Sequence, residues 1–255
     1  VESRLREAKA EAERANLSKT KFLAAVSHDL LQPLNAARLF TSALLERRDP
    51  QASSALVRNV SNSLEDVENL LGTLVDISKL DAGVIKADIA PFALSELLEN
   101  LAAEYAQVAR SEGLELHFVA CSALVRSDIQ LLARILRNLL SNAIRYTRQG
   151  RVVLGCRRQG RWLSIEVWDS GMGIAAERLE EIFQEFKRGE EQRPDQDRGL
   201  GLGLAIVEKI AGILGHRIGV RSWPGRGSVF SVQVPISASA PLPAPRPELG
   251  DALLE

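Results

Sequence analysis

Residues 128–170, DIQLLARILRNLLSNAIRYTRQGRVVLGCRRQGRWLSIEVWDS, decide the fold of the larger part of this chain. Apolar residues recur with helical period over 128–147, and two runs typical of strands follow at 151–158 and 162–170. A short turn at Gln159-Gly160 joins these runs, which indicates a β-hairpin. A helix that leads into a hairpin predicts a mixed sheet, not the parallel sheet of a doubly wound fold.

The flanking segments continue this alternation of helices and strands. The patterns predict helices over 95–113, 175–186 and 202–215, and strands over 114–120, 216–223 and 227–235. The last two strands form a second hairpin across Pro224-Gly225-Arg226. Residues 92–236 are therefore predicted to form an α/β sandwich with a mixed sheet.

The N-terminal third has a helical pattern throughout. Small apolar residues at alternating spacings of four and three predict a coiled-coil helix over 1–20: Val1, Leu5, Ala8, Ala12 and Ala15. The pattern runs on to about Arg47, breaks at 47–51, and resumes in a second helix that ends near Gly83. Residues 21–83 should thus form an all-α antiparallel hairpin, followed by a linker over 84–91. A lone hairpin buries little apolar surface, so we expect a homodimer with a four-helix bundle.

The ends of the chain carry their own signals. Four of the ten prolines lie in the last stretch, which predicts an extended linker or tail over 237–255. The chain begins at Val1, and Met172 is its only methionine, so we expect a fragment of a longer protein.

Composition excludes several classes of function. Lys and Arg total 32 and Asp and Glu total 33, and this balance does not favour a nucleic-acid-binding protein. The arginines at 151, 157, 158 and 161 are interpreted as solvated strand positions. No apolar run approaches the roughly 18–20 residues of a membrane helix, although an anchor elsewhere in the full-length protein is compatible with this. The cysteines, Cys121 and Cys156, are predicted to make neither a disulfide framework nor a metal cluster, which favours a reducing, cytoplasmic location.

One histidine has a chemically suggestive setting. His28 lies in SHDLLQPL, away from the apolar stripe of its helix, where another protein could reach it. Asp29 follows directly and can orient the imidazole so that one ring nitrogen stays nucleophilic. Pro33 should kink the helix one turn later. His117 and His216 lie in predicted strands and are interpreted as structural.

A second constellation lies on the helix over 128–147. Asn138 and Asn142 are four residues apart and therefore share a face, which Arg145 and Tyr146 continue. The surrounding residues are apolar, so these amides should enter a half-buried site. An amide oxygen suits Mg²⁺, which keeps most of its other ligands as water and phosphate.

Two glycine motifs and a polar stretch follow. Asp169 ends a predicted strand and can accept a hydrogen bond from an exocyclic amine, while Gly171 and Gly173 let the backbone approach a flat ring. Glycines 199, 201 and 203 open a predicted helix whose N–H groups can face phosphate. The stretch between them, 183–198, is predicted to be a mobile lid hinged on two buried aromatics, Phe183 and Phe186.

In this order the motifs resemble those of the sensor histidine kinases of two-component signalling. SHDLLQPL resembles the H-box, RNLLSNAIRYT the N-box, WDSGMGI the G1 box, FQEF the F-box, RGLGLGL the G2 box and PGRGSVF the last glycine box. The resemblance covers about residues 15–236. It implies a histidine-phosphotransfer hairpin followed by a Bergerat-type ATP-binding domain, with ATP and Mg²⁺ as cofactors.

The resemblance also implies a role for each matching residue. His28 would accept the γ-phosphoryl group of ATP, Asp29 would activate it, and Asn142 would ligate Mg²⁺. The other positions implied to bind ATP are Asn138, Arg145, Tyr146, Asp169, Gly171, Gly173, Phe183, Phe186, Gly199, Leu200, Gly201, Leu202 and Gly203. The phosphoryl group would pass to an aspartate of a response-regulator receiver domain, either separate or fused C-terminally.

Two residues refine this expectation. Asn138 stands where related ATPases carry a glutamate that activates water, and because an amide is a poor base, transfer to histidine is favoured over hydrolysis. Gln32 follows Asp29 by three residues, and a side chain there is thought to orient water against a phosphorylated receiver. We therefore also predict receiver phosphatase activity.

Two alternatives remain. A Bergerat-fold ATPase would share the nucleotide motifs, but it has no use for the hairpin with His28. A non-catalytic, ATP-binding dimeric scaffold would usually have lost His28, Asn142 or a glycine motif, and all are present.

Overall fold

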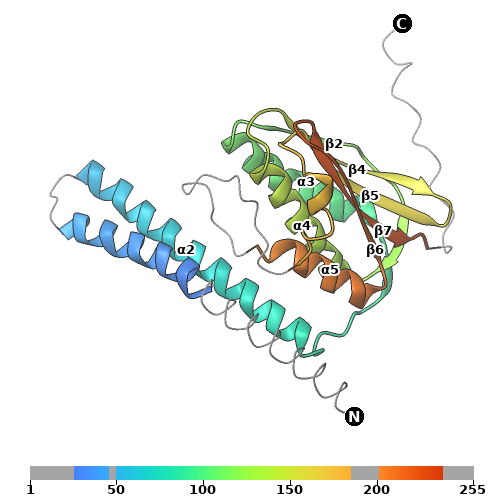
Figure 1. The fold of residues 1–255 in the computed structure, drawn as a ribbon, viewed down its shortest axis with the longest axis horizontal. Helices are drawn as coiled ribbons and strands as arrows, with labels where there is room; N and C mark the ends of the chain where they lie inside the picture. Colours follow the sequence, from blue (N-terminus) through green and yellow to red (C-terminus); the bar gives the residue numbers. More distant parts are fainter. Residues whose placement is uncertain (1–25, 46–49, 185–200, 238–255) are drawn as a thin grey trace, which may run out of the picture. The chain divides into compact units, whose positions relative to one another are not determined.

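The structure is a computed structural model that describes residues 26–45, 50–184 and 201–237. The predicted coiled coil over 1–20, Phe186, Gly199, Leu200 and the tail after 237 lie outside the described residues. The chain divides into two compact units (Figure 1). One comprises Val1–Lys86 and Glu177–Lys209, and the other Ala87–Ala176 and Ile210–Glu255.

The first unit contains the helical hairpin. A helix over residues 26–45 and α2 (Pro50–Asp81) run side by side (Figure 1). α2 begins at Pro50, a residue whose missing N–H costs nothing in the first turn of a helix. It ends where Gly83 adopts a φ of +63° and the Val84 N–H bonds back to the Lys79 carbonyl. The hairpin and its boundary near Gly83 agree with the sequence pattern.

The hairpin leaves much apolar surface exposed. Val26, Ala37, Ile77 and Leu80 are buried. Several large apolar side chains on the two helices are exposed: Leu31, Leu34, Leu39, Leu45, Val57, Leu64, Leu71 and Val75. None of the helices that the structure describes is long and apolar enough to span a bilayer.

The second unit is built on a five-stranded sheet. Its strands in spatial order are β2 (Glu115–Phe118), β4 (Arg151–Gln159), β5 (Trp162–Asp169), β7 (Gly227–Pro235) and β6 (Arg217–Trp223). β2 pairs with β4 in parallel and the other neighbours are antiparallel, so the predicted mixed sheet is confirmed. α3 (Leu94–Ser111) and α4 (Ile129–Arg145) lie together beside it (Figure 1).

α4 is placed by its cap and its apolar face. Asp128 precedes it, and Oδ1 of that residue accepts hydrogen bonds from the N–H groups of Gln130 (2.9 Å) and Leu131 (3.0 Å). Five large side chains of α4 are almost wholly buried: Leu132, Ile135, Leu136, Leu139 and Leu140. Each fully buried leucine or isoleucine contributes about 1.5–3 kcal/mol of transfer free energy, so the rotation of α4 about its axis is fixed.

Two features differ from the sequence-based expectations. β1 (Ala90–Ala93) and β3 (Leu124–Ser127) form a small antiparallel sheet that was not predicted, because each strand has four residues and β1 contains Pro91. The helix predicted over 175–186 is wrong in its described part: only a 3₁₀ turn, η1 (Ala176–Arg178), and further turns form. Leu179, Ile182 and Phe183 are only half-buried, and without a buried face so short a segment does not sustain a helix. α5 (Gly203–Leu214) follows as predicted.

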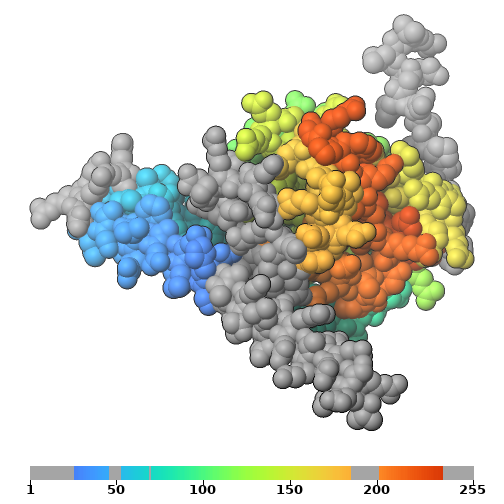
Figure 2. Space-filling view, in the orientation of Figure 1, coloured from blue at the N-terminus to red at the C-terminus, as the bar shows by residue number. Residues whose placement is uncertain are grey.

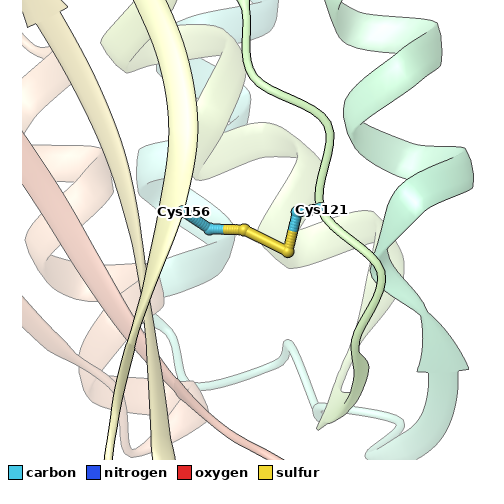
Figure 3. The surroundings of a disulfide bond; sticks show 2 residues. All are labelled: Cys121 and Cys156. Carbon is cyan, nitrogen blue, oxygen red and sulfur yellow. A yellow bond between two sulfur atoms is a disulfide. The ribbon is translucent and has the colours of Figure 1, made fainter. Parts of the chain in front are cut away.

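The prediction that the two cysteines make no disulfide framework is also wrong, because they are bonded to each other. Cys121, in the connection between β2 and β3, is bonded to Cys156 of β4, with 6.3 Å between their Cα atoms (Figure 3). Counting cysteines could not reveal this bond, because its partners are 35 residues apart and meet only when the connection folds against β4.

Candidate functional site

His28 and Asp29 form a pair on the helix over 26–45. His28 Nδ1 lies 3.1 Å from Asp29 Oδ1. The histidine side chain is 68% exposed, whereas the aspartate side chain is only 7% exposed. In the tautomer with its proton on Nδ1, the imidazole donates to the buried carboxylate, and the Nε2 lone pair remains available. The pair therefore presents a nucleophilic nitrogen on an accessible surface.

Gln32 lies one helical turn beyond His28. Residues four apart in a helix share a face, and both side chains are exposed. The amide of Gln32 is thus available on the surface that carries the histidine.

The two asparagines of α4 have different surroundings. Both are half-buried. Asn138 Nδ2 donates to the Arg134 carbonyl at 2.9 Å, whereas the Asn142 side chain has no hydrogen bond to any residue that the structure describes. Its amide oxygen can therefore ligate a cation without first breaking an internal bond. Beyond it, the Arg145 guanidinium lies 5.8 Å from the Tyr146 ring centroid, and both residues are exposed.

Asp169 ends β5 with its two carboxylate oxygens in unlike environments. Oδ1 accepts hydrogen bonds from the N–H groups of Gly171 (2.8 Å) and Ser228 (3.3 Å). Oδ2 has no partner among the described residues, so it is the oxygen that can accept from a ligand. Burial raises the pKa of Asp169, and the two N–H donors oppose that shift.

The glycines after Asp169 are required by close backbone contacts. A Cβ on Gly171 would lie 2.3 Å from the Tyr146 carbonyl oxygen. Gly173 has a φ of +70°, and a Cβ there would lie 2.1 Å from the Trp223 carbonyl oxygen. The loop thus passes between the end of α4 and the β6–β7 hairpin, which explains these glycines more directly than approach to a ligand ring.

The structure also describes residues of the second glycine motif, one of the two predicted hinge aromatics and the two other histidines. Gly201 has a φ of +65°, Leu202 is buried, and Gly203 is the first residue of α5. Phe183 is half-buried, so the interpretation of it as a buried hinge is wrong. His117 is exposed with Nε2 3.1 Å from Glu115 Oε2, and buried His216 lies with Nε2 2.7 Å from Ser127 Oγ.

Two residues beside Asp169 were missed by the sequence reasoning. Ser228 donates its backbone N–H to the carboxylate, and the hydroxyl groups of Ser222 and Ser228 lie 2.8 Å apart. The signal was present in PGRGSVF and in the preceding strand. Serine is common in strands, however, and no spacing distinguishes these two.

Known proteins match both parts of the chain. Residues 18–83 match HisKA, the His Kinase A (phospho-acceptor) domain, and residues 127–238 match HATPase_c, the histidine kinase-, DNA gyrase B- and HSP90-like ATPases. A histidine-bearing hairpin with an ATPase domain of this kind is the core of a protein-histidine kinase. The chain belongs to the sensor histidine kinases.

Individual proteins similar to this chain are also histidine kinases. An uncharacterised sensor-like histidine kinase of Rhizobium meliloti is 34% identical over 240 residues, which cover 90% of this chain and 45% of that protein. The sensor histidine kinase RcsC of Escherichia coli is 34% identical over 239 residues, 92% of this chain and 25% of RcsC. This chain therefore spans less than half the length of these relatives. The crystal structure of full-length ShkA in complex with AMPPNP superposes with a TM-score of 0.63 at 27% identity, covering 86% of this chain and 46% of ShkA.

Proposed function

We propose that this chain phosphorylates its own His28 from ATP and passes the phosphoryl group to an aspartate of a response-regulator receiver domain. The observation that carries the proposal is the His28–Asp29 pair, in which a buried carboxylate holds Nδ1 of an exposed imidazole. The ATPase domain supplies the nucleotide site. ShkA, a structural neighbour, was crystallised with AMPPNP, which is consistent with nucleotide binding in this fold.

Described residues of the second unit fit a nucleotide. Asp169 Oδ2 would accept from the adenine amine, because the two N–H donors already occupy Oδ1. The Asn142 amide oxygen would ligate Mg²⁺ with Asn138 beside it, and Arg145 and Tyr146 would contact the nucleotide. Bound MgATP supplies a γ-phosphoryl group whose charge the cation partly neutralises.

The family motifs add nine residues to this proposed site, and five of them are glycines. Gly171 and Gly173 would shape the adenine pocket. The remaining positions would come from the F-box and G2 motifs: Phe183, Phe186, Gly199, Leu200, Gly201, Leu202 and Gly203.

In the transfer step, the Nε2 lone pair of His28 forms a bond to the γ-phosphorus while the bond from that phosphorus to the bridging oxygen breaks. ADP leaves with the electron pair of the broken bond. The proton on Nδ1 stays in its hydrogen bond to Asp29, which stabilises the positive charge that develops on the ring. Asn138 is not a base, so it does not activate water against the same phosphorus.

We propose that the chain acts as a homodimer and that Gln32 assists dephosphorylation of the receiver. Three exposed apolar residues that lie seven apart on α2 support dimerisation: Val57, Leu64 and Leu71. The exposed helix face that His28 and Gln32 share supports the phosphatase role. Unchanged receiver dephosphorylation by a Gln32→Ala variant would contradict the latter.

The direct test is incubation with γ-labelled ATP and Mg²⁺. Wild type and His117→Gln, which alters an exposed histidine outside the site, should acquire acid-labile, alkali-stable label, and His28→Gln should acquire none. Label retained in His28→Gln would show that another residue is the acceptor. ATP binding without label in the wild type would favour the scaffold.

A further inference from the structure

We propose that Ser222 is a positioning residue for nucleotide recognition: its hydroxyl holds the loop after β5 against the β6–β7 hairpin and thereby fixes the orientation of the Asp169 carboxylate. The inference rests on the proposed binding of adenine by Asp169. Figure 2 shows the loop after β5, in gold, bordering the darker orange surface of the hairpin.

The Ser222 hydroxyl makes three contacts. Its Oγ accepts the Ile174 N–H at 2.7 Å, lies 2.8 Å from Ser228 Oγ and donates to the Gly227 carbonyl at 3.2 Å. A hydroxyl has one proton and two lone pairs. Donation to Gly227 leaves both lone pairs for Ile174 and Ser228, so Ser228 donates its proton to Ser222. All three contacts are therefore compatible at once.

These contacts connect to Asp169 through the register of the sheet. Asp169 on β5 is opposite Ser228 on β7, and Ser228 is opposite Ser222 on β6. The three residues form one row across neighbouring strands, at the edge where the loop leaves the sheet. Ser228 is buried and donates its backbone N–H to Asp169 Oδ1. Ser222 therefore contacts both the residue that orients the carboxylate and the loop that follows it.

The rest of the loop is held through its backbone. Met172 donates its N–H to the Tyr146 carbonyl at 3.4 Å, and its own carbonyl accepts the Gly225 N–H at 2.7 Å. The Ser222 contact to Ile174 lies two residues beyond this anchor. Without the hydroxyl, the Ile174 N–H and the Ser228 O–H both lose their partner, and the segment that carries the Gly171 donor is less constrained.

Ser222→Ala should raise the dissociation constant for ATP about tenfold, the effect of losing one or two ordered hydrogen bonds. The KM for ATP should rise similarly while kcat at saturating ATP changes little. A carboxylate accepts a hydrogen bond from the adenine amine and repels the guanine carbonyl. A misplaced Asp169 carboxylate should therefore also lower the ratio of ATP affinity to GTP affinity. Lower overall stability alone would not move that ratio.

Two variants serve as controls. Ser222→Thr keeps the hydroxyl on a residue favoured in strands and should bind ATP within about twofold of wild type. Ser231→Ala removes another serine of the same hairpin, whose Oγ donates to the Gly219 carbonyl at 3.4 Å away from the loop, and should leave both affinities unchanged.

Binding of ATP and GTP by wild type, Ser222→Ala, Ser222→Thr, Ser231→Ala and Asp169→Asn decides the matter. Weak, less selective binding by Ser222→Ala alone among the serine variants supports the proposal. If Asp169→Asn fails to bind ATP, two results would overturn the proposal and leave the adenine site intact. One is normal ATP binding by Ser222→Ala, and the other is a loss of ATP affinity in Ser231→Ala equal to that in Ser222→Ala. If Asp169→Asn binds ATP normally, the proposed adenine site itself is wrong and the inference falls with it.

Discussion

Two aspartates carry the proposed chemistry: Asp29 is buried, Asp169 is half-buried, and each lies beside the group that it serves. Asp29 is almost inaccessible and contacts an exposed imidazole, whereas Asp169 directs one oxygen to two backbone N–H groups and keeps the other unpaired. The first carboxylate orients a nucleophile, and the second is itself the binding group. Amide substitutions should therefore have different consequences at the two positions.

Asp29→Asn should lower the rate of His28 phosphorylation by about a hundredfold or more, because a neutral amide neither stabilises the developing charge nor enforces the Nδ1 tautomer. The dissociation constant for ATP should stay unchanged. Single-turnover phosphorylation with saturating ATP measures the first quantity, and Glu65→Gln, an exposed change on α2, is the matched control. A normal rate in Asp29→Asn would remove Asp29 from the mechanism.

Asp169→Asn should reduce ATP affinity at least a hundredfold without destabilising the fold. The amide oxygen must take the place of Oδ1 to accept the two N–H groups, so the NH₂ group replaces Oδ2 and faces the adenine amine, donor against donor. Because burial raises the pKa of Asp169, the charged form is disfavoured in the folded protein, and the neutral variant should melt at the same or a higher temperature. Calorimetric titration and thermal melting test both statements.

Of the two aspartate contacts, only one could be predicted from the sequence. The His28–Asp29 pair joins neighbours in one helix, so its hydrogen bond could be anticipated from SHDLLQPL. The orientation of Asp169 depends on Ser228, which is 59 residues away, and on a pairing of β5 with β7 that no local pattern specifies.

At the scale of elements, a buried histidine directly before β6 contacts the last residue of β3. His216 Nε2 lies 2.7 Å from Ser127 Oγ, and Nδ1 is buried without a partner among the described residues. Burial lowers the pKa of His216. The neutral imidazole is thus the form that this contact accommodates.

Stability should therefore fall in acid. Unfolded histidine takes up a proton near pH 6.5, whereas folded His216 does so only at lower pH. The contribution of neutral His216 to folding stability is fully present above about pH 6.5, and it is lost as the pH falls through the lowered pKa of the folded state. His216→Gln should make the decline of melting temperature between pH 7 and 5 shallower, and the exposed His117→Gln should not. An identical slope in wild type and His216→Gln would contradict this account.

Element prediction succeeded where a buried face supports the pattern. α4, β4, β5 and β7 each bury apolar residues and formed where expected. β6 also formed where expected, and it is held by its pairing with β7 although none of its own residues is fully buried. The segment predicted to be helical over 175–186 has a favourable composition, but no apolar residue in its described part, 175–184, is buried, and this part forms turns. β1 and β3 were missed because each four-residue strand depends on pairing with the other across the chain.

At the scale of the whole molecule, the described part of the helical hairpin carries a stripe of exposed apolar side chains. Val57, Leu64 and Leu71 recur every seven residues along α2 and are 53%, 47% and 47% exposed. A heptad repeat of exposed apolar residues is typical of a helix that packs against another helix. A second copy of the hairpin would cover this stripe and complete a four-helix bundle.

Leu64→Lys combined with Leu71→Lys should convert the proposed dimer into a monomer, because four desolvated charges, two from each chain, would lie in the bundle. ATP affinity should be retained, since the nucleotide site is assigned to another domain. Sedimentation velocity across a concentration series measures the change. A monomeric wild type, or a double variant that still dimerises with wild-type affinity, would contradict the proposed bundle.

The central claim is that Asp29 leaves Nε2 of His28 as the nucleophile, and the position of the phosphoryl group on the ring tests it most directly. ³¹P and ¹H–¹⁵N NMR of the protein phosphorylated with ATP and Mg²⁺, with ¹⁵N-labelled histidine, distinguish the two isomers. The account predicts a phosphorus–nitrogen bond at Nε2 of His28, with a proton retained on Nδ1. Phosphorylation at Nδ1, or at any residue other than His28, would contradict it.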